Sequence, residues 1–474
     1  MMSPMLSRLT PVALALALAG CAIGPDFLRP DALLPASFGE ATPAQPAEKS
    51  EAVDPRWWAL FKDPVLDDLV TQALANNADV RQAVARVEQA EAAAREAGAA
   101  LFPEIDGGVA TSSSKASTKT STFFAGQPTI RHANSAALST SYEMDVWGRV
   151  RRTTEASRAS LLASEYGQDA IRLSVAGLVA GNYLTLRALD AQLTVTDETV
   201  KTREQSLKLV KMRVDAGFAS PIDLFQSEGS LAQAQAQQAD LRRQRALAEH
   251  QIALVTGNPG LRIAPGDLAH LPLPPLPPAG LPSDLIDGRP DVRQAEAQLI
   301  AANAQIGIAR AGYFPRFTLT GSVGSESKTL SDLFSAGAGT WALGLNLLMP
   351  ILDFGRTTAR VDQAKALNQQ SLVAWQNTLQ TAYKEVRDAL VNLRENGEAE
   401  TAQTTRVDRA RKALELSQVR YQAGYVGYLE VLDAQRTLYD AQLAAIAVRQ
   451  ARLNSAVGLF KALGGGWKAG PGPA

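Results

Sequence analysis

The sequence has little of what metal sites and enzyme active sites are built from. Its only cysteine is Cys21, and its three histidines, His132, His250 and His270, lie far apart in the chain. It has no Cys-x-x-Cys motif, no paired-histidine motif and no glycine-rich loop ending in Gly-Lys-Ser/Thr. We therefore expect no metal site, no nucleotide hydrolysis, no catalytic residues and no cofactor of an enzymatic kind.

The chain also lacks a charge imbalance and long apolar runs. It has 47 basic and 48 acidic side chains, a formal net charge of -1, so nothing in its charge favours nucleic acid as a partner. No stretch approaches the roughly 18 uninterrupted apolar residues of a transmembrane helix. Any part that crosses a membrane is therefore expected to be made of strands.

The first residues are typical of an exported lipoprotein. Arg8 precedes an apolar run, 12–19, that is too short to span a bilayer and predicts a signal peptide over 1–20. The run ends in Leu18-Ala19-Gly20-Cys21, which resembles the bacterial lipobox and implies a covalent lipid on Cys21. Ala22, where an aspartate would imply retention in the inner membrane, resembles the outer-membrane-sorted kind. The alternative is an ordinary signal peptide followed by an unmodified cysteine.

The body of the chain is one unit repeated twice. The segment DVRQAVARVEQAEAAAREAGAALFPEI, from Asp79, aligns without gaps with DVRQAEAQLIAANAQIGIARAGYFPRF, from Asp291, and so matches Phe102-Pro103 with Phe314-Pro315. Prolines between the copies favour an extended connector. The predicted division is a signal peptide (1–20), a lipidated tether (21–56), a first repeat (57–262), a proline-rich linker (263–282), a second repeat (283–465) and a tail (466–474).

Each repeat is expected to begin with a helical stretch that stops at Phe-Pro, since the residue before a proline disfavours helix. These stretches run from about Pro64 to Ala100 and from about Pro282 to Gly312. A pair of strands follows, because apolar residues alternate there with small or polar ones. The apolar positions are Ile105, Val109, Leu138, Tyr142 and Met144 in the first repeat, and Phe317, Leu319, Gly321, Val323, Trp341, Leu343, Leu345, Leu347 and Met349 in the second.

Proline-free helical sequence then extends to about Gly217 and Gly424, roughly seventy residues or ~100 Å at 1.5 Å per residue. Shorter helices, from Pro221 to Thr256 and from Tyr428 to Leu463, predict a return and therefore antiparallel helix hairpins; a dimeric structural coiled coil is the alternative. A heptad seam with small residues that permit close helix approach is predicted in the second long helix. Its positions are Leu372, Trp375, Leu379, Ala382, Val386, Ala389 and Leu393.

Four membrane strands cannot close on themselves. Small barrels need about eight strands, and an open edge in lipid leaves backbone groups unsatisfied at several kcal/mol each. The protein is therefore expected to oligomerise. Two copies would supply eight strands and three copies twelve, and the repeat does not choose between them.

From Cys21 to about Trp467 the chain resembles the TolC-like outer membrane factors, in the OprM/NodT lipoprotein branch that serves resistance-nodulation-division (RND) pumps. The resemblance rests on the lipobox, the Phe-Pro strand starts, the Trp/Phe-Gly-Arg corners, the segment GYLEVLDAQRTLYDAQ and the closing LFKALGGGW from Leu459. It implies an α+β membrane protein with two internal repeats. A trimeric 12-stranded β-barrel, with four strands per chain, would continue into a long periplasmic α-helical barrel.

The resemblance also implies a function and partners. The chain would be the outer-membrane channel of a tripartite efflux pump, a passive gated duct for drugs or other small toxic compounds. Its partners would be two further copies of itself, a periplasmic membrane-fusion adaptor, an inner-membrane RND transporter and outer-membrane lipid. The alternatives are a duct for type I protein secretion and a lipid-anchored structural protein without a pore.

The same resemblance implies a periplasmic gate at Leu429, Asp433 and Arg436. Three carboxylates brought together by a threefold axis repel one another and favour cations. The aligned positions in the first repeat are Ile222, Gln226 and Gly229, so only the second tip carries the charged set. The alternative is that Asp433 and Arg436 form a solvated pair three residues apart on a helix face, worth a few tenths of a kcal/mol.

Two aligned tripeptides predict corners where strand becomes helix. They are Trp147-Gly148-Arg149 and Phe354-Gly355-Arg356, in which glycine permits the turn and the aromatic side chain is expected near the membrane boundary. Gly217 and Gly424 fit the tips of the helix hairpins, where an adaptor would dock.

Overall fold

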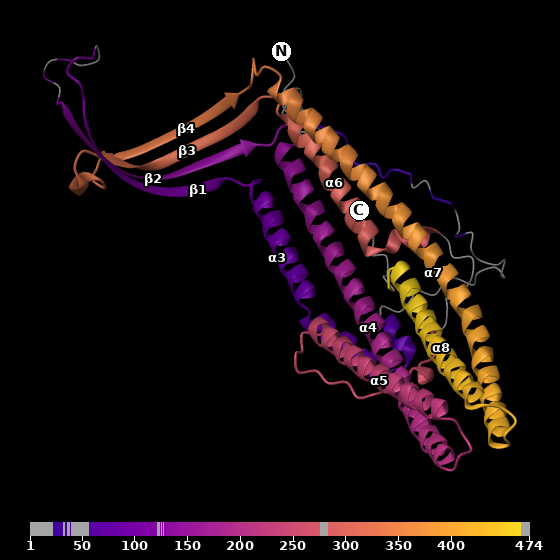
Figure 1. The fold of residues 1–474 in the computed structure, drawn as a ribbon. Coiled ribbons are helices and arrows are strands. Elements are labelled where there is room, and N and C mark those ends of the chain that lie inside the picture. Colours follow the sequence, from indigo (N-terminus) through magenta and orange to yellow (C-terminus); the bar gives the residue numbers. More distant parts are fainter. Residues whose placement is uncertain are drawn as a thin grey trace. The chain divides into compact units, whose positions relative to one another are not determined.

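One order of elements, a helical stretch, a strand pair, a long helix and a shorter return helix, occurs twice along the chain (Figure 1). The computed structural model describes residues 22–31, 34–35, 38, 56–120, 124, 126, 128–274 and 283–465. The chain forms two compact units. The first consists of 1–30, 87–164 and 295–375, and the second of 31–86, 165–294 and 376–474.

The predicted first helical stretch is wrong in one respect, because it is two helices, α2 (Pro64–Asn76) and α3 (Ala78–Ala99). The break lies at Asn77, whose side-chain oxygen accepts hydrogen bonds from the backbone N–H of Asp79 (2.9 Å) and Val80 (3.3 Å). An asparagine that caps a new helix competes with continuation of the old one. The amide of Asn77 also donates to the carbonyl of Val255 (2.9 Å).

The stretch predicted from Pro282 is divided as well. A 3-10 helix, η3 (Ser283–Gly288), precedes α6 (Pro290–Ala311). Proline at the first helical position lacks only an N–H that would have no partner inside the helix, so α6 begins there.

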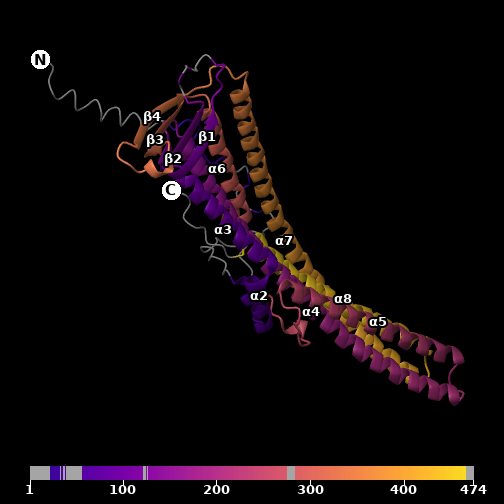
Figure 2. The same cartoon turned by 90° about the vertical axis from the view of Figure 1, so that its left-hand side faces the viewer.

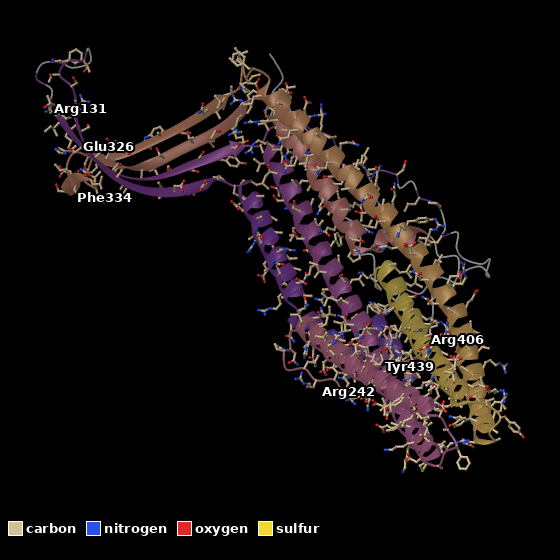
Figure 3. All side chains as sticks on the ribbon, in the orientation of Figure 1. Arg131, Arg242, Glu326, Phe334, Arg406 and Tyr439 are labelled. Atoms are coloured by element: carbon tan, nitrogen blue, oxygen red, sulfur yellow. The ribbon has the colours of Figure 1, made fainter. Side chains whose placement is uncertain are left out.

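The sheet of the first unit has four antiparallel strands in the order β1-β2-β3-β4 (Figure 1). The strands are β1 (Glu104–Lys115), β2 (Ile130–Met144), β3 (Arg316–Ser327) and β4 (Gly339–Leu348). Figure 3 places Arg131, Glu326 and Phe334 at the end of the sheet where the hairpin loops lie. The β1–β2 and β3–β4 hairpins pair through β2 and β3, which puts β1 and β4 at the two edges.

The strand register confirms the predicted alternation. Tyr142 lies opposite Leu319, and Val323 lies opposite Trp341, so the apolar residues of neighbouring strands share one face. This face is open in the chain, with 82% of Val109 and 81% of Trp341 exposed. Met349 was predicted as a strand position, but β4 ends one residue earlier, at Leu348.

The long helices α4 (Arg149–Asp215) and α7 (Arg356–Gln422) have 67 residues each. The return helices α5 (Pro221–Val255) and α8 (Tyr428–Ala462) have 35. In the second unit the predicted heptad seam of α7 is buried at Leu379, Ala382, Val386, Ala389 and Leu393. Among the described residues, no helix is both long enough and apolar enough to cross a bilayer.

A buried ionic cluster in the second unit fixes the chain that follows α5. The carboxylate of Asp190 accepts hydrogen bonds from Arg187 (3.0 Å), Arg245 (2.6 Å) and the backbone N–H of Gly266 (3.0 Å). Each lone pair used in this way offsets part of the cost of removing the charges from water. The start of the connector is thereby bound to α4 and α5.

Gly324 on β3 offers a test of the sheet. A Cβ added there would lie 2.7 Å from Cα of Ala137 on β2 and closer still to the carbonyl oxygen of Ala136. We expect Gly324→Ala to lower the melting temperature of the detergent-solubilised protein, as overpacking of about 1–3 kcal/mol does. Gly108→Ala on β1 is the matched control, because a Cβ there meets nothing within 4 Å. Equal melting of the two variants would contradict the β2–β3 packing described here.

Candidate channel sites at the corners and helix tips

The first corner joins β2 to α4 at Gly148. Its φ of +79° is left-handed, which glycine adopts without strain. The neighbouring Trp147 donates from its indole nitrogen to the carbonyl of Pro315 (2.8 Å), and its ring centroid lies 4.7 Å from that of Phe314. Since Phe314 and Pro315 directly precede β3, Trp147 joins the end of one strand to the start of the next.

A charged clamp stands beside this contact. Arg149 donates from two nitrogens to the two carboxylate oxygens of Glu143 on β2 (2.7 and 2.8 Å). Arg316, the first residue of β3, lies 3.5 Å from the same carboxylate. The hydrogen bonds to Glu143 raise the pKa of the Arg149 guanidinium above its usual value. Asp145 completes the corner by accepting from the backbone N–H of Val150 and Arg151 at the start of α4 (2.9 Å each).

The second corner, between β4 and α7, turns in the same way but has different contacts. Phe354 and Gly355 have φ values of +51° and +83°. Asp353 accepts from the backbone N–H of Gly355 (3.0 Å) and Thr357 (2.9 Å), and the hydrogen bonds from Thr357 lower the pKa of its carboxyl. The ring of Phe354 is 90% exposed. In the part of the chain that the structure describes, the side chain of Arg356 makes no ion pair or hydrogen bond.

Residues 22–30 were expected to form an extended tether, but the described structure shows them packed within the first unit. The backbone N–H of Ile23 donates to the carbonyl of Trp147 (3.0 Å). Arg152 on α4 pairs with Asp26 (2.6 Å), and Asn303 on α6 donates to the carbonyl of Pro25 (3.0 Å). The described part of the predicted tether therefore has no helix or strand but is bound to the first unit, and Cys21 itself lies outside the described residues.

A glycine pair was the available signal for this packing. Gly24 has a φ of +127°, and a Cβ on it would lie 2.6 Å from Cα of Gly307 on α6. Only glycine permits such a close approach between two backbones. Neither glycine was singled out in the sequence, because Gly24 lies in a proline- and alanine-rich segment without periodicity and Gly307 lies inside a predicted helix.

The helix tips lie at Gly217 and Gly424, as the sequence predicts for helix ends. Both glycines have positive φ, +75° and +78°. The following residues, Phe218 and Tyr425, donate backbone hydrogen bonds five residues back (2.7 and 2.9 Å), which is the Schellman pattern of a helix end. The two hairpins end side by side (Figures 1 and 2).

An aromatic cluster holds the two tips of one chain together. Tyr421 on α7 and Tyr428 on α8 are buried with Val210 on α4 and with Val431. The guanidinium of Arg213 lies 4.6 Å from the ring centroid of Tyr421, a cation–π distance. Farther along α8, Tyr439, labelled in Figure 3, has its hydroxyl 3.0 Å from that of Thr196 on α4.

Leu429, Asp433 and Arg436 lie on one exposed stripe of α8, at intervals of four and three residues. The opposite face is buried at Tyr428 and Val431. Within the described ranges, neither Asp433 nor Arg436 makes an ion pair or hydrogen bond, so the pair three residues apart that was the alternative to a gate is not formed.

No metal centre is visible at these positions. Over the residues whose placement is described, no group of three or more His, Cys, Asp or Glu side chains is arranged to hold a metal ion. The ionisable groups at the corners and tips are instead used in ion pairs and helix caps, or are exposed to solvent.

An open antiparallel sheet with an exposed apolar face, turned by tight corners into long helix hairpins, is the protomer fold of TolC-like outer-membrane channels. The family model described as "Outer membrane efflux protein" matches residues 69–258 and again 281–465. The chain belongs to this family and is a protein of the outer membrane.

Individual relatives match over nearly the whole chain. The toluene efflux pump outer membrane protein TtgF of Pseudomonas putida is 36% identical, with 96% of each chain covered. The cation efflux system protein CusC of Escherichia coli is 32% identical over 98% of this chain and 100% of its own. The open-state outer membrane channel MtrE of Neisseria gonorrhoeae superposes with a TM-score of 0.84, at 30% identity, covering 94% of this chain and 99% of its own.

The first corner yields a prediction about Glu143. Glu143→Gln removes the counter-ion of Arg149 and Arg316, and losing one partner of a partly buried charged pair costs about 1–3 kcal/mol. We expect a lower melting temperature in detergent, measured by circular dichroism. Asp388→Asn, which breaks an exposed pair with Lys384, is the control and should change melting little. If Glu143→Gln melts like the control, the clamp does not stabilise the corner.

Proposed function

We propose that the protein is the outer-membrane channel of a tripartite efflux pump, a passive gated duct formed by three copies. The observation that carries the proposal is the open four-stranded sheet. Its apolar face is exposed, and each of the edge strands β1 and β4 pairs with a described strand on one side only, which leaves its outer edge unpaired. Three sheets joined edge to edge would give a 12-stranded barrel whose outer face meets lipid. The α4–α5 and α7–α8 hairpins of three copies would form the periplasmic helical barrel.

The remaining components of the pump would supply energy and selectivity. We assign a periplasmic adaptor and an inner-membrane RND transporter as partners, because the relatives are named as outer-membrane parts of efflux pumps. Relatives of similar identity are named for toluene, an antibiotic and a cation. A duct of this kind therefore does not need to recognise its cargo, and we assign it no catalytic activity.

The pump assignment predicts a gain of function in cells. A Gram-negative host without its own efflux channel should accumulate less fluorescent dye when this chain is expressed together with an RND adaptor and transporter. The chain expressed alone is the control and should leave accumulation unchanged. Export of a type I secreted polypeptide, with dye accumulation unaltered in both strains, would contradict the efflux assignment.

We also propose that Cys21 carries a covalent lipid. The residue after it, Ala22, lies against Gly148, since a Cβ on that glycine would be 2.9 Å from Cα of Ala22. A lipid attached one residue earlier would begin beside the corner where β2 ends, at the level at which the apolar sheet face stops. Insertion of its acyl chains there would add roughly 0.8 kcal/mol per buried methylene.

Lipidation is tested by labelling. Cells supplied with radioactive palmitate should incorporate label into the wild-type protein and none into Cys21→Ala, because Cys21 is the only cysteine. The trimer should persist in the variant, since the strands and not the lipid close it. An unlabelled wild-type protein would contradict the assignment.

The exposed stripe of α8 is proposed as the periplasmic gate. In a trimer it would bring three copies each of Leu429, Asp433 and Arg436 near one axis, and Arg436 and Asp433 would be free to bind groups of the neighbouring copies. Asp433→Ala and Arg436→Ala should each raise single-channel conductance in planar bilayers. Gln226→Ala, the aligned position of the first tip, is the control and should not. Unchanged conductance in both charge variants would remove these residues from the gate.

A further inference from the structure

The internal seam of the sheet, where β2 meets β3, is closed by two contacts at its corner end. Trp147 binds Phe314-Pro315, the dipeptide that precedes β3. A salt bridge between Arg149 and Glu143 stands next to it and also involves Arg316 on β3. The strand that enters the corner and the strand that follows in the sheet are thereby fixed to each other.

The residues aligned with these in the other repeat lie at the two outer edges of the same sheet, where they do not meet each other. Phe354 is aligned with Trp147, and Phe102-Pro103 is aligned with Phe314-Pro315. Phe354 is 90% exposed and Phe102 is 72% exposed, whereas Phe314 is 37% exposed. The exposed pair lies at opposite edges of the sheet, after β4 and before β1, so the two residues cannot meet within one chain.

The charges at the two edges are complementary. Arg356 is aligned with Arg149, and Glu104, the first residue of β1, is aligned with Arg316. At the internal seam the carboxylate belongs to Glu143 on β2. The residue aligned with Glu143 in the second repeat is Pro350, just after β4, which has no carboxylate. A seam between β4 and β1 would thus have its carboxylate on β1. In the described chain the exposed side chains of Glu104 and Arg356 make neither an ion pair nor a hydrogen bond.

We infer that a second copy of this chain closes this edge by repeating the internal seam. Phe354 packs on Phe102-Pro103 of the neighbouring copy, and Arg356 pairs with Glu104 of that copy. The inference rests on the proposed trimer and adds the contacts that select the partner edge. A head-to-tail contact of this kind leaves no free edge once the ring has closed.

The repeat also gives the register of the new strand pair. Met144 lies opposite Phe317 in the internal seam. The residues aligned with this pair are Ile351 and Ile105. With Ile351 opposite Ile105 of the neighbouring copy, antiparallel pairing places Leu347, four residues before Ile351, opposite Val109, four residues after Ile105. Both side chains lie on the exposed apolar face, 55% and 82% exposed. The register therefore continues that face from one copy to the next, which a shift by one residue would not do.

A charge exchange tests the ion pair. Glu104→Arg and Arg356→Glu should each reduce the fraction of trimer that survives heating in detergent, because like charges then face each other across the seam. The double variant restores the pair and should recover the wild-type fraction. Failure of the double variant to recover, with a trimeric wild type, would overturn the inference and leave the trimer standing. A monomeric wild type would overturn the proposed trimer itself.

Cross-linking tests the register independently of the charges. Leu347→Cys combined with Val109→Cys should give disulfide-linked dimers and trimers on mild oxidation, because opposite Cβ atoms in antiparallel strands come within bonding range. Leu347→Cys combined with Ala110→Cys is the matched control, since Ala110 lies on the other face of β1, and it should give none. Cross-linking of the control pair alone would overturn the register, and the single variants show any contribution from Cys21.

Discussion

The backbone of an edge strand in lipid must find a hydrogen-bonding partner, and the rest of this structure depends on that requirement. One chain supplies four strands, two of them edges, and presents an apolar face that water does not favour. The sheet of a single copy is consequently not a closed barrel. In the proposed trimer, closure by further copies would pair the open edges and place the apolar face against lipid in one step, so oligomerisation, membrane insertion and channel formation would be one event.

The two corners connect the strands of the sheet to the long helices. Gly148 and Gly355 turn the chain from strand into helix, and Asp145 and Asp353 cap the helices that begin there. Each long helix begins at the residue after its corner glycine, so in the proposed trimer a ring of strands would continue into a ring of helices. The packing of residues 22–30 beside the first corner would place a lipid on Cys21, as proposed, near the same level.

The sequence predicts the repeating parts of this architecture well. Alternation along Trp341 to Leu347 and the heptad seam from Leu379 to Leu393 report burial on one side of a regular element, and the structure confirms both. The glycines that end the long helices, Gly217 and Gly424, were predicted because positive φ values select that residue. Periodicity and backbone restriction are local properties, and they can be read without knowing the fold.

Features that depend on tertiary contacts could not be predicted in this way. Asn77 breaks a helix whose composition favours continuation, and its side chain also binds the distant carbonyl of Val255. The docking of Gly24 on Gly307 involves residues far apart in sequence. The two corners looked equivalent, but Trp147 has a partner within the chain and Phe354 does not. The proposed gate residues Asp433 and Arg436 were predicted from the family resemblance, since neither periodicity nor backbone restriction distinguishes them, and the structure places both on an exposed stripe of α8.

The central claim, that three copies close one membrane duct, is tested most directly by native mass spectrometry of the purified full-length protein combined with single-channel recording in a planar bilayer from the same detergent preparation. The account predicts a trimer with a low, cation-preferring conductance. A monomer or dimer without conductance would contradict it and would favour a structural lipoprotein that forms no pore.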